Sequence, residues 1–208
     1  MKSIVIRGSG GHAREVAFLI ERVNQVKPTW DLLGYIDIQD KGETKYGYKV
    51  LGDDSWFLEN NDVKNCVIAI GNPRDKMKVY NEIQKYNLIF PNIIDNQAVI
   101  AKDVKMGFGN VIQGPAKLSV GVEIGNFCLT NGVCSLGHDV VIGDFVSIMP
   151  FTAISGNVKV GNNTFIGMGV KLVQGITVGS NAIICASSLV LDNIEDGAKV
   201  LGIPAKKR

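Results

Sequence analysis

The stretch from Leu136 to Ser147, LGHDVVIGDFVS, holds two copies of a six-residue unit that begins with an aliphatic residue and a glycine. The unit recurs seventeen times between Ile94 and Glu195. Its first position is aliphatic in every copy except the one with Thr130. The first positions are Ile94, Ile100, Met106, Ile112, Leu118, Ile124, Thr130, Leu136, Ile142, Ile148, Ile154, Val160, Ile166, Leu172, Val178, Ile184 and Val190. A fixed period of this kind means that each unit buries its apolar face against the next.

Six residues suit one short strand and one tight corner. The fifth position is small or β-branched almost throughout, which fits a corner that crowds the core, and Cys128 and Cys134 occupy it as reduced core thiols. The second position is often glycine, as expected where a corner needs positive φ or has no room for a Cβ atom. Three strands close a triangular coil of 18 residues. The pattern therefore predicts a parallel β-helix of nearly six coils, in which residues 18 apart stack.

Residues 1–90 differ from this pattern, because predicted strands alternate with predicted helices. That alternation favours a small α/β domain with a parallel sheet. The predicted strands cover residues 2–7, 32–36, 48–51, 65–70 and 88–90, and the predicted helices cover residues 13–23 and 74–86.

Composition is that of an ordinary soluble protein, with a net charge of +2 and 20% charged residues. The basic ending Lys206–Arg208 is too short to indicate a nucleic-acid partner. No apolar run approaches the roughly 18 residues of a membrane span, and the start does not resemble a signal peptide. We therefore expect a cytoplasmic protein. The four cysteines form no CxxC pair, so we expect no metal.

The first predicted strand ends in a glycine-rich loop. Gly8, Gly10 and Ala13 match the pattern G-x-G-x-x-A at a strand-to-helix junction, and Asp37 ends the second strand. Such a loop lets a phosphate approach the free N–H groups of a helix N-terminus. Three interpretations are open: a redox dinucleotide, a tight turn that needs glycine for packing, or the nucleotide of a sugar substrate. About 90 residues are too few for the usual dinucleotide-binding fold, so we favour the third.

The repeat contains one histidine, His138, at the third position of its unit and therefore near an outward corner. Asp139 follows it, and Gly156 lies one coil further along. Acyl transfer needs a base and an N–H donor a few ångströms apart. An isolated His beside an Asp is more often ordinary surface, so the stacking of Gly156 on His138 is the feature that favours a site.

Three segments resemble the sugar-nucleotide acetyltransferase family of hexapeptide-repeat acyltransferases. They are residues 8–12 (GSGGH), residues 137–145 (GHDVVIGDF) and residues 202–206 (GIPAK). The family includes N-acetyltransferases of bacillosamine synthesis and relatives of sialic acid O-acetyltransferases. The resemblance spans the whole chain and implies that the β-helix is left-handed.

The resemblance also implies roles for individual residues. His138 corresponds to the catalytic base, Asp139 to the acid that orients it, and the backbone of Gly156 to the group facing the acetyl carbonyl. Acetyl-CoA is expected in a groove between two subunits of a homotrimer. Its contacts would come from Met168, Ala186 and the position of Ser147. The N-terminal loop, Gly10, Gly11 and His12, would hold a nucleotide-linked amino sugar together with Asp37.

Two departures from the family pattern concern the cofactor side of the site. Gly137 stands where the family often has an acid, and Ser147 where it often has a histidine that touches the cofactor. Phe127 and Phe145, 18 apart, predict a stacked aromatic column, and Val133 and Phe151 a second one. Such columns indicate either a subunit interface or a surface covered by the N-terminal domain.

Taken together, the sequence predicts a Rossmann-like nucleotide-sugar-binding domain at 1–90 and a left-handed parallel β-helix at 91–208. The predicted activity is acetyl-CoA-dependent N-acetylation of a nucleotide-linked amino sugar for surface glycan synthesis, without an acyl-enzyme. O-acetylation of sialic acid or a related sugar is the alternative enzyme hypothesis. A nucleotide-sugar sensor or scaffold and an NAD- or FAD-dependent dehydrogenase are the hypotheses from other classes.

Overall fold

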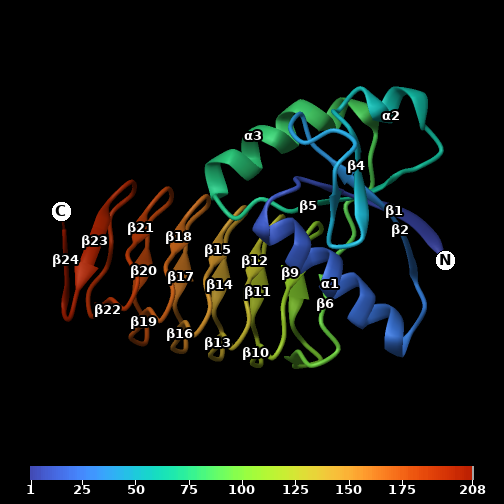
Figure 1. Cartoon of the computed structure of the whole chain (residues 1–208). Helices are drawn as coiled ribbons and strands as arrows, with labels where there is room; N and C mark the ends of the chain where they lie inside the picture. The colour runs from blue at the N-terminus through green and yellow to red at the C-terminus, as the bar shows by residue number, and fades with distance from the viewer. Residues whose placement is uncertain (208) are drawn as a thin grey trace.

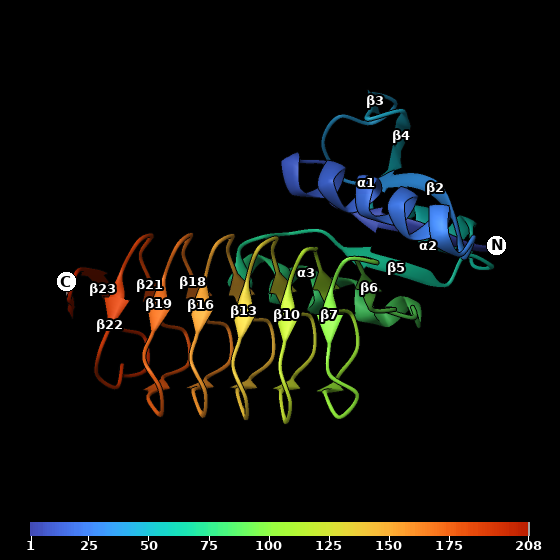
Figure 2. The same cartoon turned by 90° about the horizontal axis from the view of Figure 1, so that it is seen from below.

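The computed structural model describes residues 1–207 and combines an α/β region with a long three-sided β-helix (Figure 1). The α/β region packs against one side of the β-helix near its N-terminal end, and the last coils extend beyond it (Figures 1 and 2). Its elements are β1 (Lys2–Arg7), α1 (Gly11–Val26), β2 (Trp30–Ile36), β3 (Thr44–Lys45), β4 (Tyr48–Gly52), α2 (Trp56–Glu59), β5 (Asn65–Ile68), α3 (Pro73–Ile83) and a 3₁₀ turn (Gln84–Tyr86).

The N-terminal sheet has the strand order β3-β4-β2-β1-β5. Strands β4, β2, β1 and β5 are parallel, and β3 forms an antiparallel hairpin with β4. The helix and strand predictions are confirmed with small changes at their ends. The strand predicted at 88–90 is wrong, because only Ile89 forms an isolated bridge to Asn65. The segment instead leads directly into the first coil.

Each hexad contributes one two-residue strand that ends at the aliphatic first position. The strands are β6 (Ile93–Ile94), β7 (Val99–Ile100), β8 (Lys105–Met106), β9 (Val111–Ile112), β10 (Lys117–Leu118), β11 (Glu123–Ile124), β12 (Leu129–Thr130), β13 (Ser135–Leu136), β14 (Val141–Ile142), β15 (Ser147–Ile148), β16 (Ala153–Ile154), β17 (Lys159–Val160), β18 (Phe165–Ile166), β19 (Lys171–Leu172), β20 (Thr177–Val178), β21 (Ile183–Ile184) and β22 (Leu189–Val190). The left-handed parallel β-helix expected from the sequence is thus the fold of this region.

The strands form three faces. The first face is β7-β10-β13-β16-β19-β22, the second is β8-β11-β14-β17-β20, and the third runs from β6 through β9, β12, β15, β18 and β21 to β23 (Lys199–Gly202) and β24 (Ala205–Lys207). Neighbouring strands on each face pair at an offset of 18, for example Ser135 with Ala153. The aliphatic first positions fill one continuous core between the faces.

The offset of 18 ends in the last hexad. Ile184 pairs with Val200 and Val178 with Ile194, which are offsets of 16. The prediction that the period holds through Glu195 is therefore wrong by two residues in the final coil. The antiparallel pair β23–β24 follows and closes the end of the third face, because a terminal coil has no further coil to pair with.

Glycine at the second position of the unit is needed for space. A Cβ atom on Gly125 would lie 2.8 Å from the Gly143 backbone one coil on. Positive φ falls instead at the fourth position, where Phe127, Asp139 and Phe145 all have φ between 54° and 58°. The corners therefore hold a row of left-handed residues, which are uncommon outside glycine.

Small polar side chains at the fifth position join successive coils. Their donors bond to backbone carbonyls 15 residues later, in the pairs Asn110–Gly125, Cys128–Gly143, Cys134–Met149, Thr152–Gly167 and Thr164–Gly179. Burial raises the pKa of Cys128 to about 12 and that of Cys134 to about 11. Both thiols are therefore protonated donors inside the corners, in agreement with the predicted core role.

The N-terminal region covers the third face. Apolar residues of α1 pack with Ile93, Val111 and Leu129 in one cluster. Phe127 and Phe145 stack with ring centroids 5.1 Å apart, as predicted, and Tyr80 of α3 lies 4.5 Å from Phe127. Phe127 is only 2% exposed. The N-terminal region therefore packs against this column. Val133 and Phe151, at another corner, are exposed.

One buried charge lies at this junction. The Lys76 ammonium donates to the Phe127 carbonyl at 3.0 Å and to the Ser147 hydroxyl at 3.2 Å, and the residue is 3% exposed. Burial lowers the pKa of Lys76 to about 8. No carboxylate among residues 1–207 forms an ion pair with Lys76. Its ammonium is instead hydrogen-bonded to two groups of the β-helix.

Candidate active site

His138 and Asp139 form a pair at the corner between the first and second faces, which we call the His138 corner. The Nδ1 atom of His138 lies 2.9 Å from the Oδ2 atom of Asp139, and both side chains are about half exposed. An ionised carboxylate only accepts hydrogen bonds, so Nδ1 carries the proton and donates it. The Nε2 atom then keeps its lone pair and is free to act as a base.

Gly156 stacks on His138, as the offset of 18 predicts. A Cβ atom built on Gly156 would collide with three atoms of the imidazole ring, Nε2 included. The coils are held in register here by the Asn157 N–H, which donates to the His138 carbonyl at 2.8 Å. Among residues 1–207, no acceptor takes the N–H of Gly156. A base and a free backbone donor therefore lie beside each other at this corner.

The predicted cofactor residues separate into two groups. Met168 and Ala186 lie one coil apart at the corner between the third and first faces, both are exposed, and the Ser187 N–H donates to the Met168 carbonyl. Ser147 is fully buried and accepts from Lys76. The prediction that Ser147 contacts the cofactor does not fit this placement, because α3 covers Ser147.

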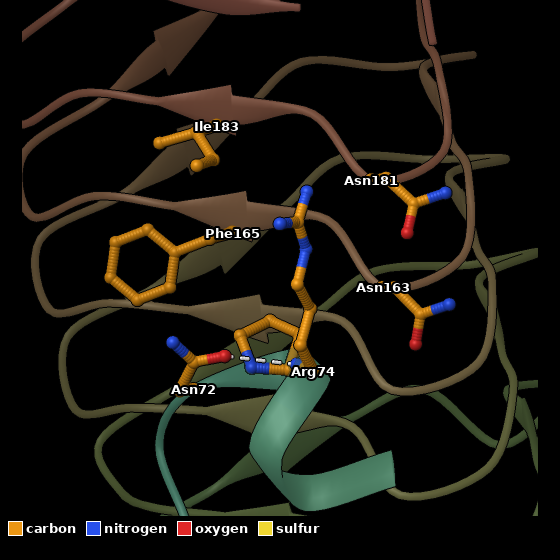
Figure 3. Close-up of a pocket in the computed structure, with 7 residues that line it drawn as sticks. Asn72, Arg74, Asn163, Phe165, Asn181 and Ile183 are labelled. Carbon is orange, nitrogen blue, oxygen red and sulfur yellow. Dashed lines mark hydrogen bonds between the residues drawn. The ribbon is translucent and has the colours of Figure 1, made fainter. Parts of the chain in front are cut away.

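A cavity of about 220 Å³ lies where α3 begins, on the uncovered part of the third face (Figure 3). Phe165 and Ile183, in the same column as Ser147 but one and two coils on, form its apolar side. In Figure 3 the Arg74 side chain extends from α3 between Phe165 and Asn163. Asn72 caps the helix by accepting from the Arg74 N–H at 2.9 Å.

The glycine-rich loop contains one glycine that the backbone geometry requires and two that it does not. Gly8 has φ +115°, and a Cβ atom there would lie 3.0 Å from the Ala69 carbonyl oxygen, so this position requires glycine. Gly10 and Gly11 lack positive φ, and a Cβ atom on Gly10 would meet nothing within 4 Å. Packing therefore does not explain Gly10, which leaves the N-terminus of α1 open. That helix has no side-chain cap and no acid in its first turn.

His12 and Asp37 flank this loop. His12 lies 3.3 Å from Glu15 on the next turn of α1, and the hydrogen bond with His12 lowers the pKa of Glu15. Asp37 follows β2 and accepts from the Gln39 N–H at 3.1 Å. Asp40, three residues on, is the acid that reaches the loop, because it accepts from the Ser9 hydroxyl and pairs with Lys45.

Two adjoining cavities open beside the loop, of about 450 and 490 Å³. They share Gly11, Arg14 and Tyr46 as lining residues. Sequence reasoning missed Arg14 and Tyr46, along with Glu15, Phe18 and Lys45. Three of these residues carried a signal: Arg14, Glu15 and Phe18 share with Gly11 the spacing of one helical face, and Phe18 is an apolar residue on that otherwise polar face. Lys45 and Tyr46 carried none.

His138 and the glycine-rich loop lie on different sides of the β-helix within one chain. The N-terminal region packs on the third face, whereas His138 lies at the corner between the other two faces. In a three-sided coil that corner is opposite the third face. The structure thus brings His138, Asp139 and Gly156 together but does not bring them to Gly10, Gly11 and His12 of the same chain.

Residues 1–207 contain no cluster of three or more His, Cys, Asp or Glu side chains arranged to hold a metal ion. No helix in the same range has both the length and the apolar character needed to cross a membrane. Cys66, Cys128 and Cys134 are buried, so none of them is open to a substrate.

Two family models match the chain, and they define its class. Residues 3–83 match the PglD N-terminal domain, and residues 157–192 match the bacterial transferase hexapeptide repeat. No protein with a curated description matches in sequence. The fold and the repeat together make this chain an enzyme of the hexapeptide transferase class.

Solved structures narrow the class. A variant of perosamine N-acetyltransferase from Caulobacter crescentus, in complex with CoA and GDP-perosamine, is 26% identical with a TM-score of 0.90, over 100% of this chain and 97% of that one. WeeI from Acinetobacter baumannii is 27% identical with a TM-score of 0.90, over all of both chains. The acetyltransferase domain of PglB from Neisseria gonorrhoeae, at 24% identity and a TM-score of 0.90 over 100% and 99%, shares the fold. The chain therefore belongs to the sugar-nucleotide acetyltransferase family of hexapeptide-repeat acyltransferases.

Proposed function

We propose that the protein transfers the acetyl group of acetyl-CoA to the amine of a nucleotide-linked amino sugar, for surface glycan synthesis. The observation that carries the proposal is the His138 corner. There a base oriented by Asp139 lies against the free N–H of Gly156. The similarity to a perosamine N-acetyltransferase over the whole chain supports an amine acceptor over the hydroxyl of sialic acid or a related sugar.

The chemistry is a direct transfer. The sugar amine attacks the thioester carbonyl carbon, and the Nε2 atom of His138 takes the proton that the amine loses. Asp139 holds the imidazole and stabilises its charged form. The Gly156 N–H donates to the oxyanion that forms on the carbonyl. When the C–S bond breaks, the protonated His138 returns the proton to the CoA sulfur, so no covalent enzyme intermediate is required.

The two proposed ligands bind at two exposed surfaces, one on the β-helix and one on the N-terminal region. Met168 and Ala186 are proposed to contact the CoA arm on the coils beyond His138. Gly10, Gly11 and His12 hold the nucleotide of the sugar, with Asp37 at the end of the neighbouring strand. The two-domain division at residue 90 fits this separation of ligands.

Because His138 lies opposite the face that carries the N-terminal region, the proposed site needs two copies of the chain. One copy supplies the nucleotide-sugar loop, and another supplies His138. A homotrimer closes such heterologous contacts into a ring. The exposed Val133 and Phe151 are available for this contact.

The test is release of CoA thiol from acetyl-CoA with a panel of UDP-, dTDP-, GDP- and CMP-linked sugars, with amino and hydroxyl acceptors. We expect an amino sugar to be the substrate. His138→Ala should lower kcat by roughly 10²- to 10⁴-fold with unchanged acetyl-CoA binding. Lys102→Ala, in the same column two coils earlier, is the matched control and should keep full activity. Near-normal turnover of His138→Ala would refute the assignment.

A further inference from the structure

The two cavities beside the glycine-rich loop differ in chemistry although they share three lining residues. The first is lined by Ser9, Gly10 and Lys45 in addition to the shared residues, and its lining is mainly polar. The second is lined by Glu15 and Phe18 in addition to the same shared residues, and its lining is mainly apolar. A nucleoside diphosphate has the same division, with a charged diphosphate at one end and a flat base at the other.

The polar cavity suits the diphosphate. It lies at the N-terminus of α1, a helix of 16 residues whose first N–H groups no side chain caps. Arg14 forms no ion pair with any of residues 1–207, so its guanidinium is available. Lys45 of β3 also lines this cavity and is paired with Asp40. Backbone donors, a free guanidinium and an ammonium around one space are the groups that bind phosphate oxygens.

The apolar cavity suits the base. Phe18 of α1 is 48% exposed and Tyr46 of the β3–β4 hairpin is 47% exposed. Their rings are 6.4 Å apart in an edge-to-face arrangement, although they come from separate elements. Tyr46 is held by its hydroxyl, which donates to Glu21 at 3.1 Å. Exposed aromatic side chains that border a cavity next to a phosphate site are platforms on which bases stack.

Glu15 decides which base fits. Its carboxylate borders the apolar cavity, and the hydrogen bond with His12 keeps its pKa low. A carboxylate has only acceptor oxygens and binds best to two neighbouring N–H donors. Guanine presents such a pair, at N1 and the 2-amino group. Uracil and thymine present one N–H between two carbonyl oxygens, and these oxygens are repelled by a carboxylate. Adenine and cytosine present an amino group beside an acceptor nitrogen, so they also lack two neighbouring donors.

We propose that the sugar donor site is selective for guanosine diphosphate sugars, with the base against Phe18 and Tyr46 and its donor edge on Glu15. This inference rests on the proposed use of a nucleotide-linked sugar and adds the identity of the nucleotide. The diphosphate then lies on the N–H groups of α1, between Arg14 and Lys45.

The test is calorimetric titration of the full chain with GDP, UDP, dTDP, CDP and ADP, without acetyl-CoA. GDP should bind roughly ten-fold or more tightly than the others, because only guanine satisfies the carboxylate with two hydrogen bonds. Glu15→Gln should weaken GDP by about the same factor and change UDP little. Glu59→Gln removes an exposed carboxylate elsewhere in the N-terminal region and is the matched control.

Two substitutions of Tyr46 test whether the base stacks on an aromatic ring. Tyr46→Ala should weaken all five nucleotides together by roughly five-fold or more, and Tyr46→Phe should not, because stacking needs the ring and not the hydroxyl. Equal or tighter binding of UDP or dTDP, or unchanged GDP binding by Glu15→Gln, would overturn the inference, as would absence of nucleotide binding. Acetylation of a UDP- or dTDP-linked amino sugar with loss of activity in His138→Ala would overturn only the nucleotide assignment and leave the proposed function in place.

Discussion

The β-helix and the N-terminal region place their functional residues in different ways. On the β-helix, His138 and Gly156 meet because each coil repeats the previous one after 18 residues, and local corner geometry fixes both. In the N-terminal region, Arg14 and Tyr46 border one space because a helix and a distant hairpin fold onto each other. A repeat thus turns sequence spacing into spatial position, whereas a mixed sheet requires the whole tertiary structure.

The largest expected effect lies where the two regions join. Phe127→Ala should lower the free energy of unfolding by roughly 3–5 kcal/mol, because the ring is buried between Phe145 and Tyr80. Leu58→Ala is the control. Leu58 lies on α2 and is 67% exposed, so its truncation should cost about 0.5 kcal/mol, as is usual for surface substitutions. Urea unfolding measures the free energy of unfolding of both variants. Equal losses would show that packing on Phe127 does not stabilise the N-terminal region.

Lys76 provides a pH test of the same junction. Burial lowers the pKa of Lys76 from 10.5 to about 8, so the folded state releases this proton before the unfolded state does. The unfolding free energy should therefore rise between pH 8 and pH 10.5, by up to about 3 kcal/mol relative to Lys76→Met. Unfolding curves of both proteins across this range check the prediction, and parallel pH profiles would contradict the burial of a charged Lys76.

The smallest of these three effects falls on the repeat, and it tests the offset of 18 directly. Gly156→Ala places a methyl group against the His138 imidazole, whose flexible side chain then moves. We expect kcat to fall by roughly 10²-fold, because small displacements of a catalytic group are costly, and the melting temperature to change little. Gly71→Ala, where a Cβ atom meets nothing within 4 Å, is the control for stability. Full activity of Gly156→Ala would mean that the imidazole does not act from this position.

These differences explain which features could be predicted from the sequence. The coil, the stacking of Gly156 on His138 and the Phe127–Phe145 column follow from the period alone. The period did not predict the burial of Ser147. Ser147 is covered by α3, and its partner there, Lys76, lies 71 residues earlier in the chain. The period also did not predict the contraction of the last coil to an offset of 16, because Ile194 satisfies the apolar pattern at either offset.

In the N-terminal region, strands and helices were predictable because their apolar spacing is local. The glycine-rich loop was recognised from its motif, but the motif did not separate the structural Gly8 from the open Gly10. Asp37 was selected because it ends a strand, while the acid that reaches the loop is Asp40, through contacts with Ser9 and Lys45. Side chains that meet through a hairpin leave no periodic trace.

The claim that one site needs two copies of the chain is tested most directly by complementation. Gly10→Asp places a carboxylate where the phosphate is proposed to bind, at a helix N-cap where Asp favours folding, and His138→Ala removes the base. Neither variant alone should acetylate the sugar. Refolded together in equal amounts, they should recover roughly a quarter of the wild-type activity, because that fraction of sites pairs an intact loop with an intact His138. Mixed assemblies that form but stay inactive would contradict a site shared between subunits.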